Sequence, residues 1–188
     1  RGHLDRVAGY CTILAEEIGC PGEQIELLRH ASILHDVGKI SVPDEILLKE
    51  GSLTDEEWEV MKKHTVIGAR ILSEAHSEIL QLAQCIALNH HENWDGSGYP
   101  HRLAGENIPL FGRVVAVADV FDALVSKRSY KESYDISKAL QIIKDFSGSK
   151  FDPQCVSAFI TRFDDILAVY QRYSTSDENN QPPVPFNA

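Results

Sequence analysis

The stretch IELLRHASILHDVGK, residues 25–39, repeats apolar side chains at steps of three and four residues. That spacing is typical of a helix with one buried face. We expect a helix over residues 23–37, and Gly38 is a residue that ends helices. Because His35 continues the apolar face, the sequence places an imidazole on the inward side of this helix. The residue after it, Asp36, adds a carboxylate at the same point.

The same period recurs along most of the chain and indicates a bundle of helices. Further helices are expected over residues 4–18, 54–73, 79–92, 110–126, 136–146 and 153–173. Thr54 and Glu57 form a capping box at the start of one of them. Residues 93–109 contain several glycines and prolines and are expected to form an irregular Gly-rich loop. The sequence therefore predicts one compact all-α domain over residues 1–173, followed by a flexible polar tail over residues 174–188.

Composition narrows the classes of function. The 188 residues suffice for one domain with its own core. The net charge of −10 argues against non-specific binding of DNA or RNA. No apolar run is long enough to span a bilayer, so no membrane contact is expected. The four cysteines form no C-x-x-C pair, which argues against a thiolate zinc site and favours a reducing, cytoplasmic compartment. Because residues 1–4 read like the interior of a helix, we expect the chain to be part of a longer protein.

Several histidines lie where the expected helices place apolar residues. They are His35, His64, His90 and His91. An unpaired buried polar group costs about 1–3 kcal/mol, so each imidazole needs a partner. One such histidine is most simply a hydrogen-bonded core residue, but four of them with Asp36 indicate a metal site between helices. Asp36 has two carboxylate oxygens and can bridge two cations. Lys39 either meets a substrate phosphate or is simply an exposed lysine near a helix end.

The loop HHENWDGSGYP, residues 90–100, is the second long motif after HDVGK at residues 35–39. Together these motifs resemble the HD-GYP family, a branch of the HD phosphohydrolase superfamily, over residues 3–153. The resemblance implies a helical bundle of the HD-domain type, in which the Gly-rich loop is the GYP loop. One departure is Arg102, which stands where the family more usually has glycine.

The resemblance also implies roles for individual residues. The metal ligands would be His3, His35, Asp36, His64, His90, His91 and Asp119. One ion would be bound by His3, His35, Asp36 and Asp119, and a second by Asp36, His64, His90 and His91, which gives two divalent ions per chain. Asp36 and Lys39 would act in catalysis, and Lys39, Tyr99, Arg128 and Lys131 would bind the substrate. Asp122 is left open, either as a support for the site or as a partner of Lys131. Nitrogen and oxygen ligands suit iron, manganese, nickel or zinc, and the resemblance favours iron or manganese.

Two metals bound in this way can activate water for attack on a phosphodiester. The resemblance implies that the substrate is cyclic di-GMP, cleaved to pGpG and in some members onward to GMP, in bacterial second-messenger signalling. The alternatives are a phosphodiesterase for cyclic GMP-AMP, an inactive receptor or interaction module, and an HD hydrolase acting on nucleotides such as dNTPs. An upstream sensor or regulatory domain and a GGDEF-domain partner bound through the GYP loop are also implied. Trp94 and Tyr99 either stack on a guanine base or pack the loop.

Overall fold

The computed structural model describes residues 2–74, 76–126 and 134–178, the last five by their backbone alone. Within these ranges the chain forms helices joined by turns and one long loop, which confirms the predicted all-α bundle. The α-helices are α1 (Gly2–Ile18), α2 (Gly22–Ala31), α3 (Asp44–Leu47), α4 (Asp55–Lys62), α5 (His64–Leu72), α6 (Glu78–Asn89), α7 (Leu110–Val125), α8 (Ile136–Asp145), α9 (Pro153–Thr161) and α10 (Phe163–Glu178). Short 3-10 helices are η1 (Ser32–Leu34), η2 (Val37–Ser41) and η3 (Gly105–Asn107).

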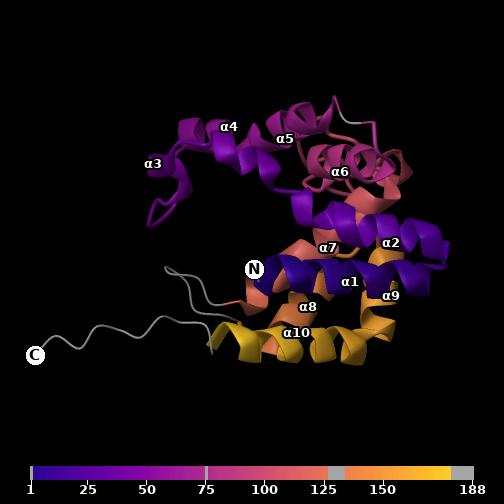
Figure 1. Ribbon diagram of the computed structural model, residues 1–188. Coiled ribbons are helices and arrows are strands. Elements are labelled where there is room, and N and C mark those ends of the chain that lie inside the picture. The colour runs from indigo at the N-terminus through magenta and orange to yellow at the C-terminus, as the bar shows by residue number, and fades with distance from the viewer. Residues whose placement is uncertain (1, 75, 127–133, 179–188) are drawn as a thin grey trace, which may run out of the picture.

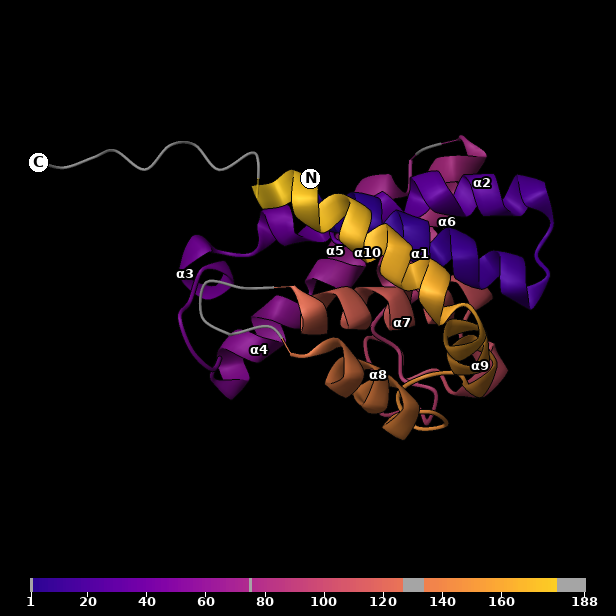
Figure 2. The ribbon, with the colours of Figure 1, turned by 90° about the horizontal axis from the view of Figure 1, so that it is seen from below.

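Helix α1 lies at the centre of the bundle, between α2 on one side and α10 on the other (Figure 1). Figure 2 shows α10 crossing over α1, with α7, α8 and α9 beside them. The core contains a chain of aromatic rings. Tyr10 of α1 meets Phe121 of α7 at 5.5 Å between centroids, and Phe121 meets Phe159 of α9 at 4.9 Å. This packing fixes α1 against α7, the two helices that carry the first and last of the predicted metal ligands.

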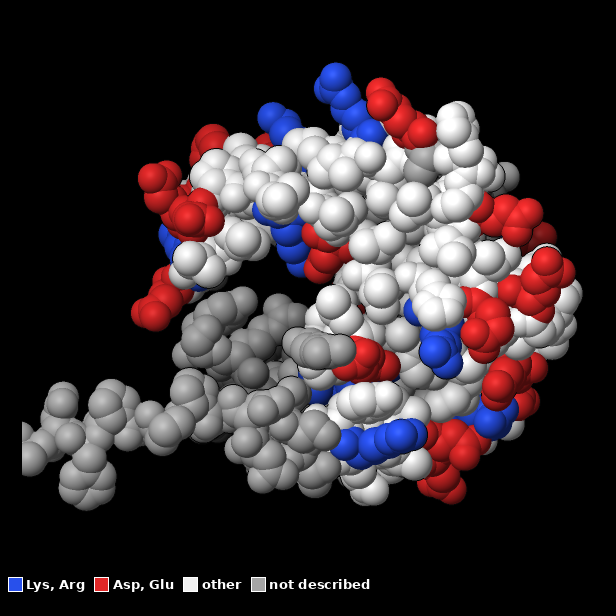
Figure 3. Space-filling model, viewed as in Figure 1, with Lys and Arg blue, Asp and Glu red and all other residues white. Residues whose placement is uncertain are grey.

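The segment between η2 and α5, residues 42–62, projects from the bundle as an arm that contains α3 and α4 (Figure 1). The predicted capping box at the start of α4 is confirmed. Thr54 Oγ1 accepts from the Glu57 amide at 3.3 Å, and Glu57 Oε2 accepts from the Thr54 amide at 2.7 Å. The surface is hollowed beneath this arm (Figure 3). Acidic side chains are spread along the outline of the same face, with Lys and Arg side chains between them.

The α-helix ends before the HDVGK stretch, earlier than predicted. Helix α2 ends at Ala31, η1 follows, and Asp36 lies between η1 and η2. The backbone is closely packed at Gly38, where a Cβ would lie 1.9 Å from the main-chain oxygen of His64. Gly38 is therefore required for the contact between η2 and α5, and its role is more than ending a helix. That contact brings Asp36 next to His64.

Other helix ends also differ from the expectation. The predicted helix over residues 54–73 is divided at Lys63, and that over residues 153–173 at Arg162. Helix α10 continues to Glu178, so residues 174–178 are helical where we expected the tail to begin. The remaining tail residues lie outside the described part of the chain. Among the described residues, no helix combines the length and apolar character needed to cross a membrane.

Candidate metal centre

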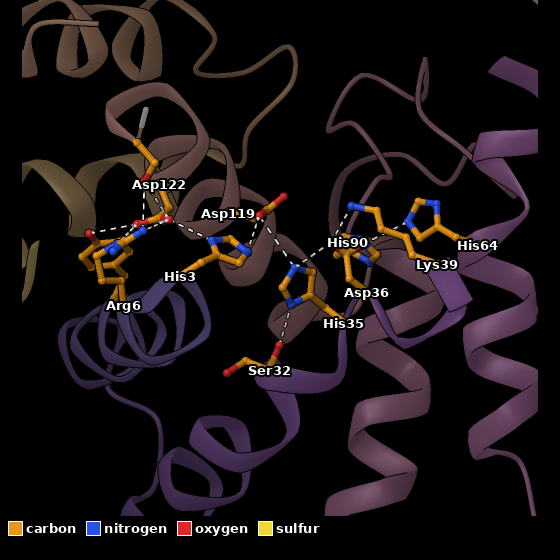
Figure 4. A network of polar contacts seen from close by, with 12 residues as sticks. His3, Arg6, Ser32, His35, Asp36, Lys39, His64, His90, Asp119 and Asp122 are labelled. Carbon is orange, nitrogen blue, oxygen red and sulfur yellow. Dashed lines mark hydrogen bonds and ion pairs between the residues drawn. The ribbon is translucent and has the colours of Figure 1, made fainter. Parts of the chain in front are cut away.

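The predicted metal ligands gather in two adjacent groups. One group is Asp36, His64, His90 and His91, and the other is His3, His35 and Asp119. Within each group, one possible ligand atom from every residue lies within 4.8 Å of the others. Figure 4 shows His35 and Asp36 between the end with Asp119 and His3 and the end with His64. The fold therefore brings every predicted ligand to one centre, from segments far apart in the sequence.

The carboxylate of Asp36 faces both groups. Its Oδ1 lies 3.4 Å from His64 Nε2 and 3.7 Å from His90 Nε2. Its Oδ2 lies 3.5 Å from His35 Nε2, and His35 Nε2 is in turn 3.6 Å from Asp119 Oδ1. One oxygen is thus directed to each group, which is the arrangement needed for a carboxylate that bridges two cations.

Main-chain carbonyls fix the orientation of three of these imidazoles. The Nδ1 atoms of His35, His64 and His90 donate to the carbonyls of Ser32, Met61 and Ile86 at 2.7, 2.8 and 3.1 Å. In its neutral form each imidazole therefore carries its lone pair on Nε2, which points into the centre. These three Nε2 atoms and Asp36 Oδ1 are buried and find no hydrogen-bond partner in the described part of the chain. Buried polar atoms of a native protein are normally paired, so this set fits divalent metal ions.

A further imidazole, that of His3, is oriented by a side chain. His3 Nδ1 donates to Asp122 Oδ2 at 2.7 Å, which turns Nε2 towards Asp119 Oδ1 at 3.7 Å. Asp122 is fully buried and also accepts from Arg6 Nε at 2.6 Å. Burial would raise the pKa of Asp122, but the hydrogen bonds from His3 and Arg6 outweigh it and hold the pKa below its usual range. Asp122, whose role the sequence left open, thus supports the site.

The pKa values of several histidines and aspartates in the centre are shifted in directions that favour cation binding. Burial lowers the pKa of His64 to about 4. Burial and the neighbouring imidazoles lower the pKa of His91 well below its ordinary value. Burial would raise the pKa of Asp36 and Asp119, but adjacent imidazoles outweigh it and hold the pKa of both below the usual range. At neutral pH these two imidazoles are neutral and these two carboxylates are ionised, which is the state that metal binding requires.

Two predicted substrate-binding residues border the centre. Lys39 Nζ donates to Asp36 Oδ2 at 2.5 Å, and its side chain is 37% exposed. Tyr99 stacks on His91, with 4.9 Å between ring centroids and 24° between ring planes. The other two predicted substrate-binding residues, Arg128 and Lys131, lie outside the described residues.

The Gly-rich loop folds back tightly on the residues that precede it. A Cβ on Gly98 would lie 2.2 Å from the amide nitrogen of Asn93, so only glycine fits. The carboxylate of Glu92 accepts from the amides of His101 at 2.7 Å and Leu103 at 3.0 Å. Glu92 therefore anchors the loop that carries Tyr99. Sequence reasoning did not predict this anchoring role, and the only signal was the place of an acid directly after two predicted ligands.

Trp94 and Arg102 are two further loop residues on which the sequence left a question. Trp94 packs against α7, with the Arg113 guanidinium 5.7 Å from its ring centroid. This contact favours loop packing over base stacking for Trp94. Arg102 has a φ of +55°, in the left-handed region that favours glycine. Arg102 thus has a backbone conformation that glycine adopts more readily.

A family model described as the HD domain matches residues 1–155. The chain belongs to the HD domain family. This HD domain is 47% identical over 178 residues to a cyclic di-GMP phosphodiesterase of Thermotoga maritima, covering 95% of this chain and 48% of that protein. It is 43% identical over 167 residues to the 3′3′-cGAMP-specific phosphodiesterase 2 of Vibrio cholerae, covering 89% of this chain and 32% of that protein.

The fold has a counterpart among solved structures. The crystal structure of a cyclic GMP-AMP-specific phosphodiesterase of V. cholerae superposes with a TM-score of 0.67 at 23% identity, over 96% of this chain and 49% of that chain. The resemblance inferred from the motifs is therefore confirmed. This HD domain spans about half, or less, of the length of these relatives.

Proposed function

We propose that this HD domain is a binuclear metal-dependent phosphodiesterase that hydrolyses cyclic di-GMP to pGpG, with GMP as a further product. One observation carries the proposal. The Asp36 carboxylate directs one oxygen to each of two histidine groups, and the buried Nε2 atoms around it have no described hydrogen-bond partner. The name of the relative that is 47% identical supports the choice of cyclic di-GMP.

The proposed ligands divide as the geometry groups them. His3, His35, Asp36 and Asp119 would bind one divalent ion, and Asp36, His64, His90 and His91 the other. Iron and manganese are the metals we propose, and nickel or zinc would suit the same nitrogen and oxygen ligands. When bound, such ions supply Lewis acidity that lowers the pKa of water and polarises a phosphodiester.

The chain's own residues have distinct parts in the reaction. Asp36 would keep the two cation positions adjacent through its two oxygens. Lys39 already has its ammonium at the Asp36 carboxylate and would offset charge on the phosphoryl oxygens as the leaving oxygen departs. Arg128 and Lys131 would contact the second phosphate of the substrate, which the metal ions do not contact. Tyr99 would keep His91 in place by stacking on its ring.

Cyclic GMP-AMP is a second candidate substrate, because a relative that is 43% identical carries the name of a cGAMP-specific enzyme. The two cyclic dinucleotides share the phosphodiester chemistry and differ in one base. An inactive receptor is less well supported, because every predicted ligand residue is present in the centre. An upstream regulatory domain, a cytoplasmic location and a GGDEF-domain partner at the GYP loop complete the proposal.

The test is metal analysis of anaerobically purified protein, combined with product chromatography on the same batch. We expect two metal ions per chain and turnover of cyclic di-GMP, with cyclic GMP-AMP and a dNTP as comparison substrates. Metal-loaded protein that binds cyclic di-GMP without cleaving it would establish a receptor instead. Arg128→Ala and Lys131→Ala should raise KM for cyclic di-GMP and leave metal content unchanged. Loss of metal in either variant would assign that residue to the structure of the centre.

A further inference from the structure

Tyr99 contacts a second aromatic ring besides that of the proposed metal ligand His91. Trp58 of α4 meets Tyr99 edge-to-face, with 5.8 Å between ring centroids and 83° between ring planes. Because Tyr99 stacks on His91, the three rings form a line from the centre to the arm. Trp58 is 44% exposed, although a tryptophan side chain is usually well buried.

The other aromatic residues near the centre offer less free ring surface. One face of Tyr99 is covered by His91, and the Lys62 ammonium lies 6.0 Å from the Tyr99 centroid. Trp94 lies against Arg113 of α7. Trp58 therefore has an exposed indole ring, and its contact with Tyr99 connects it to the proposed metal ligand His91.

We propose that the indole of Trp58 is a stacking platform for one nucleobase of the substrate. The proposal rests on the proposed function, because a phosphate bound at the centre would bring a base to the arm. Stacking on an aromatic side chain accepts any base and changes affinity roughly 5- to 150-fold when the side chain is truncated. Lys62 lies one turn further along α4, on the same side as Trp58. Its ammonium pairs with Glu59 at 2.6 Å and lies 6.0 Å from the Tyr99 ring centroid, and its remaining protons can be donated to acceptor atoms on a base edge.

Fluorescence tests the platform without turnover. The chain has two tryptophans, so Trp94→Phe leaves Trp58 as the one reporter. Metal-loaded Trp94→Phe protein is titrated with GMP, which contains no diester to be hydrolysed, and with ribose 5-phosphate, which has no base. We expect saturable quenching by GMP and none by ribose 5-phosphate. Equal quenching by both ligands would overturn the proposal, as would GMP that inhibits hydrolysis without quenching Trp58.

Steady-state kinetics provides the second test. Trp58→Ala should raise KM for cyclic di-GMP about tenfold, while Trp58→Phe recovers most of that loss and both variants keep two metals per chain. Trp94→Phe is the matched control and should keep the wild-type KM. If the wild type cleaves cyclic di-GMP and Trp58→Ala has the same KM, the platform is refuted and the proposed function stands. If the wild type cleaves no cyclic dinucleotide, the proposed function fails. Quenching by GMP then still shows whether Trp58 stacks on a base. Metal loss in Trp58→Ala would make Trp58 a support for Tyr99 and overturn the proposal.

Discussion

The buried carboxylate of Asp122 joins the metal centre to the packing of α1 on α7, so Asp122→Asn perturbs both. The substitution keeps the shape of the side chain and removes its charge. The buried guanidinium of Arg6, which is 5% exposed, then loses the negative charge of Asp122. Removing one partner of a buried pair typically costs about 3–5 kcal/mol. Because an amide oxygen still accepts from Arg6, and Arg6 also donates to Ser126, we expect a loss of about 3 kcal/mol in the free energy of unfolding.

The second effect concerns His3. A carboxylate behind a ligating imidazole fixes its tautomer and raises its basicity, and loss of such a partner typically costs 10- to 100-fold in metal affinity. We expect the ion at His3, His35 and Asp119 to bind more weakly by about this factor. The ion at His64 and His90 should be retained, because main-chain carbonyls orient those two imidazoles.

Two measurements separate the effects. Urea unfolding of metal-free protein gives the stability change, and competition with a chelator gives the affinity of each ion. The double variant Arg6→Met with Asp122→Leu serves as the control, because replacing both members of a buried pair by apolar residues is often neutral. It should recover stability and still bind the His3 ion weakly. Wild-type affinity for both ions in the double variant would refute the positioning role of Asp122. A loss below about 1 kcal/mol in Asp122→Asn would refute the buried-pair argument.

Four other predictions follow from the same geometry. Asp36→Ala should abolish hydrolysis and reduce metal content with helical circular dichroism intact, and more than about a tenth of wild-type activity would contradict a bridging ligand. Gly38→Ala should destabilise the fold by about 2–3 kcal/mol in urea, because its Cβ would meet the main-chain oxygen of His64, and an unchanged midpoint would contradict this contact. Arg102→Gly should raise the free energy of unfolding by up to about 1 kcal/mol by relieving the left-handed backbone, whereas a lower value would show that no strain exists there. Chelation of the bound metals should lower Tm by about 5–10 °C in calorimetry, with recovery on adding Mn²⁺, and an insensitive Tm would exclude tight metal binding.

Local signals indicated most of the candidate ligands, whereas His3 and Asp119 were predicted from the family resemblance. HDVGK and the HHENWDGSGYP loop are contiguous motifs, and His64 falls on an apolar helical face. The apolar period of residues 110–126 also indicated α7 as a helix, although its β-branched residues equally suit a strand. These features depend on neighbours three or four residues away, which a sequence shows directly.

The remaining features depend on contacts between distant segments. The close approach of Gly38 in η2 to the backbone of α5 is one such contact, and no local signal reports it. The bond between His3 and Asp122 joins the first helix to α7, and the approach of Trp58 to Tyr99 joins the arm to the loop. Each requires the tertiary arrangement before the pairing can be recognised.

The two kinds of anchor for the imidazoles have a consequence for how this centre can evolve. His35, His64 and His90 are oriented by main-chain carbonyls, which no point mutation deletes, whereas His3 depends on the side chain of Asp122. The two cation positions are therefore unequally protected against genetic drift. A gene copy released from selection would lose the His3 position first, through single codon changes at Asp122. Decay of the centre would then pass through a form that still binds the other ion, which gives selection an intermediate on which to build a new role.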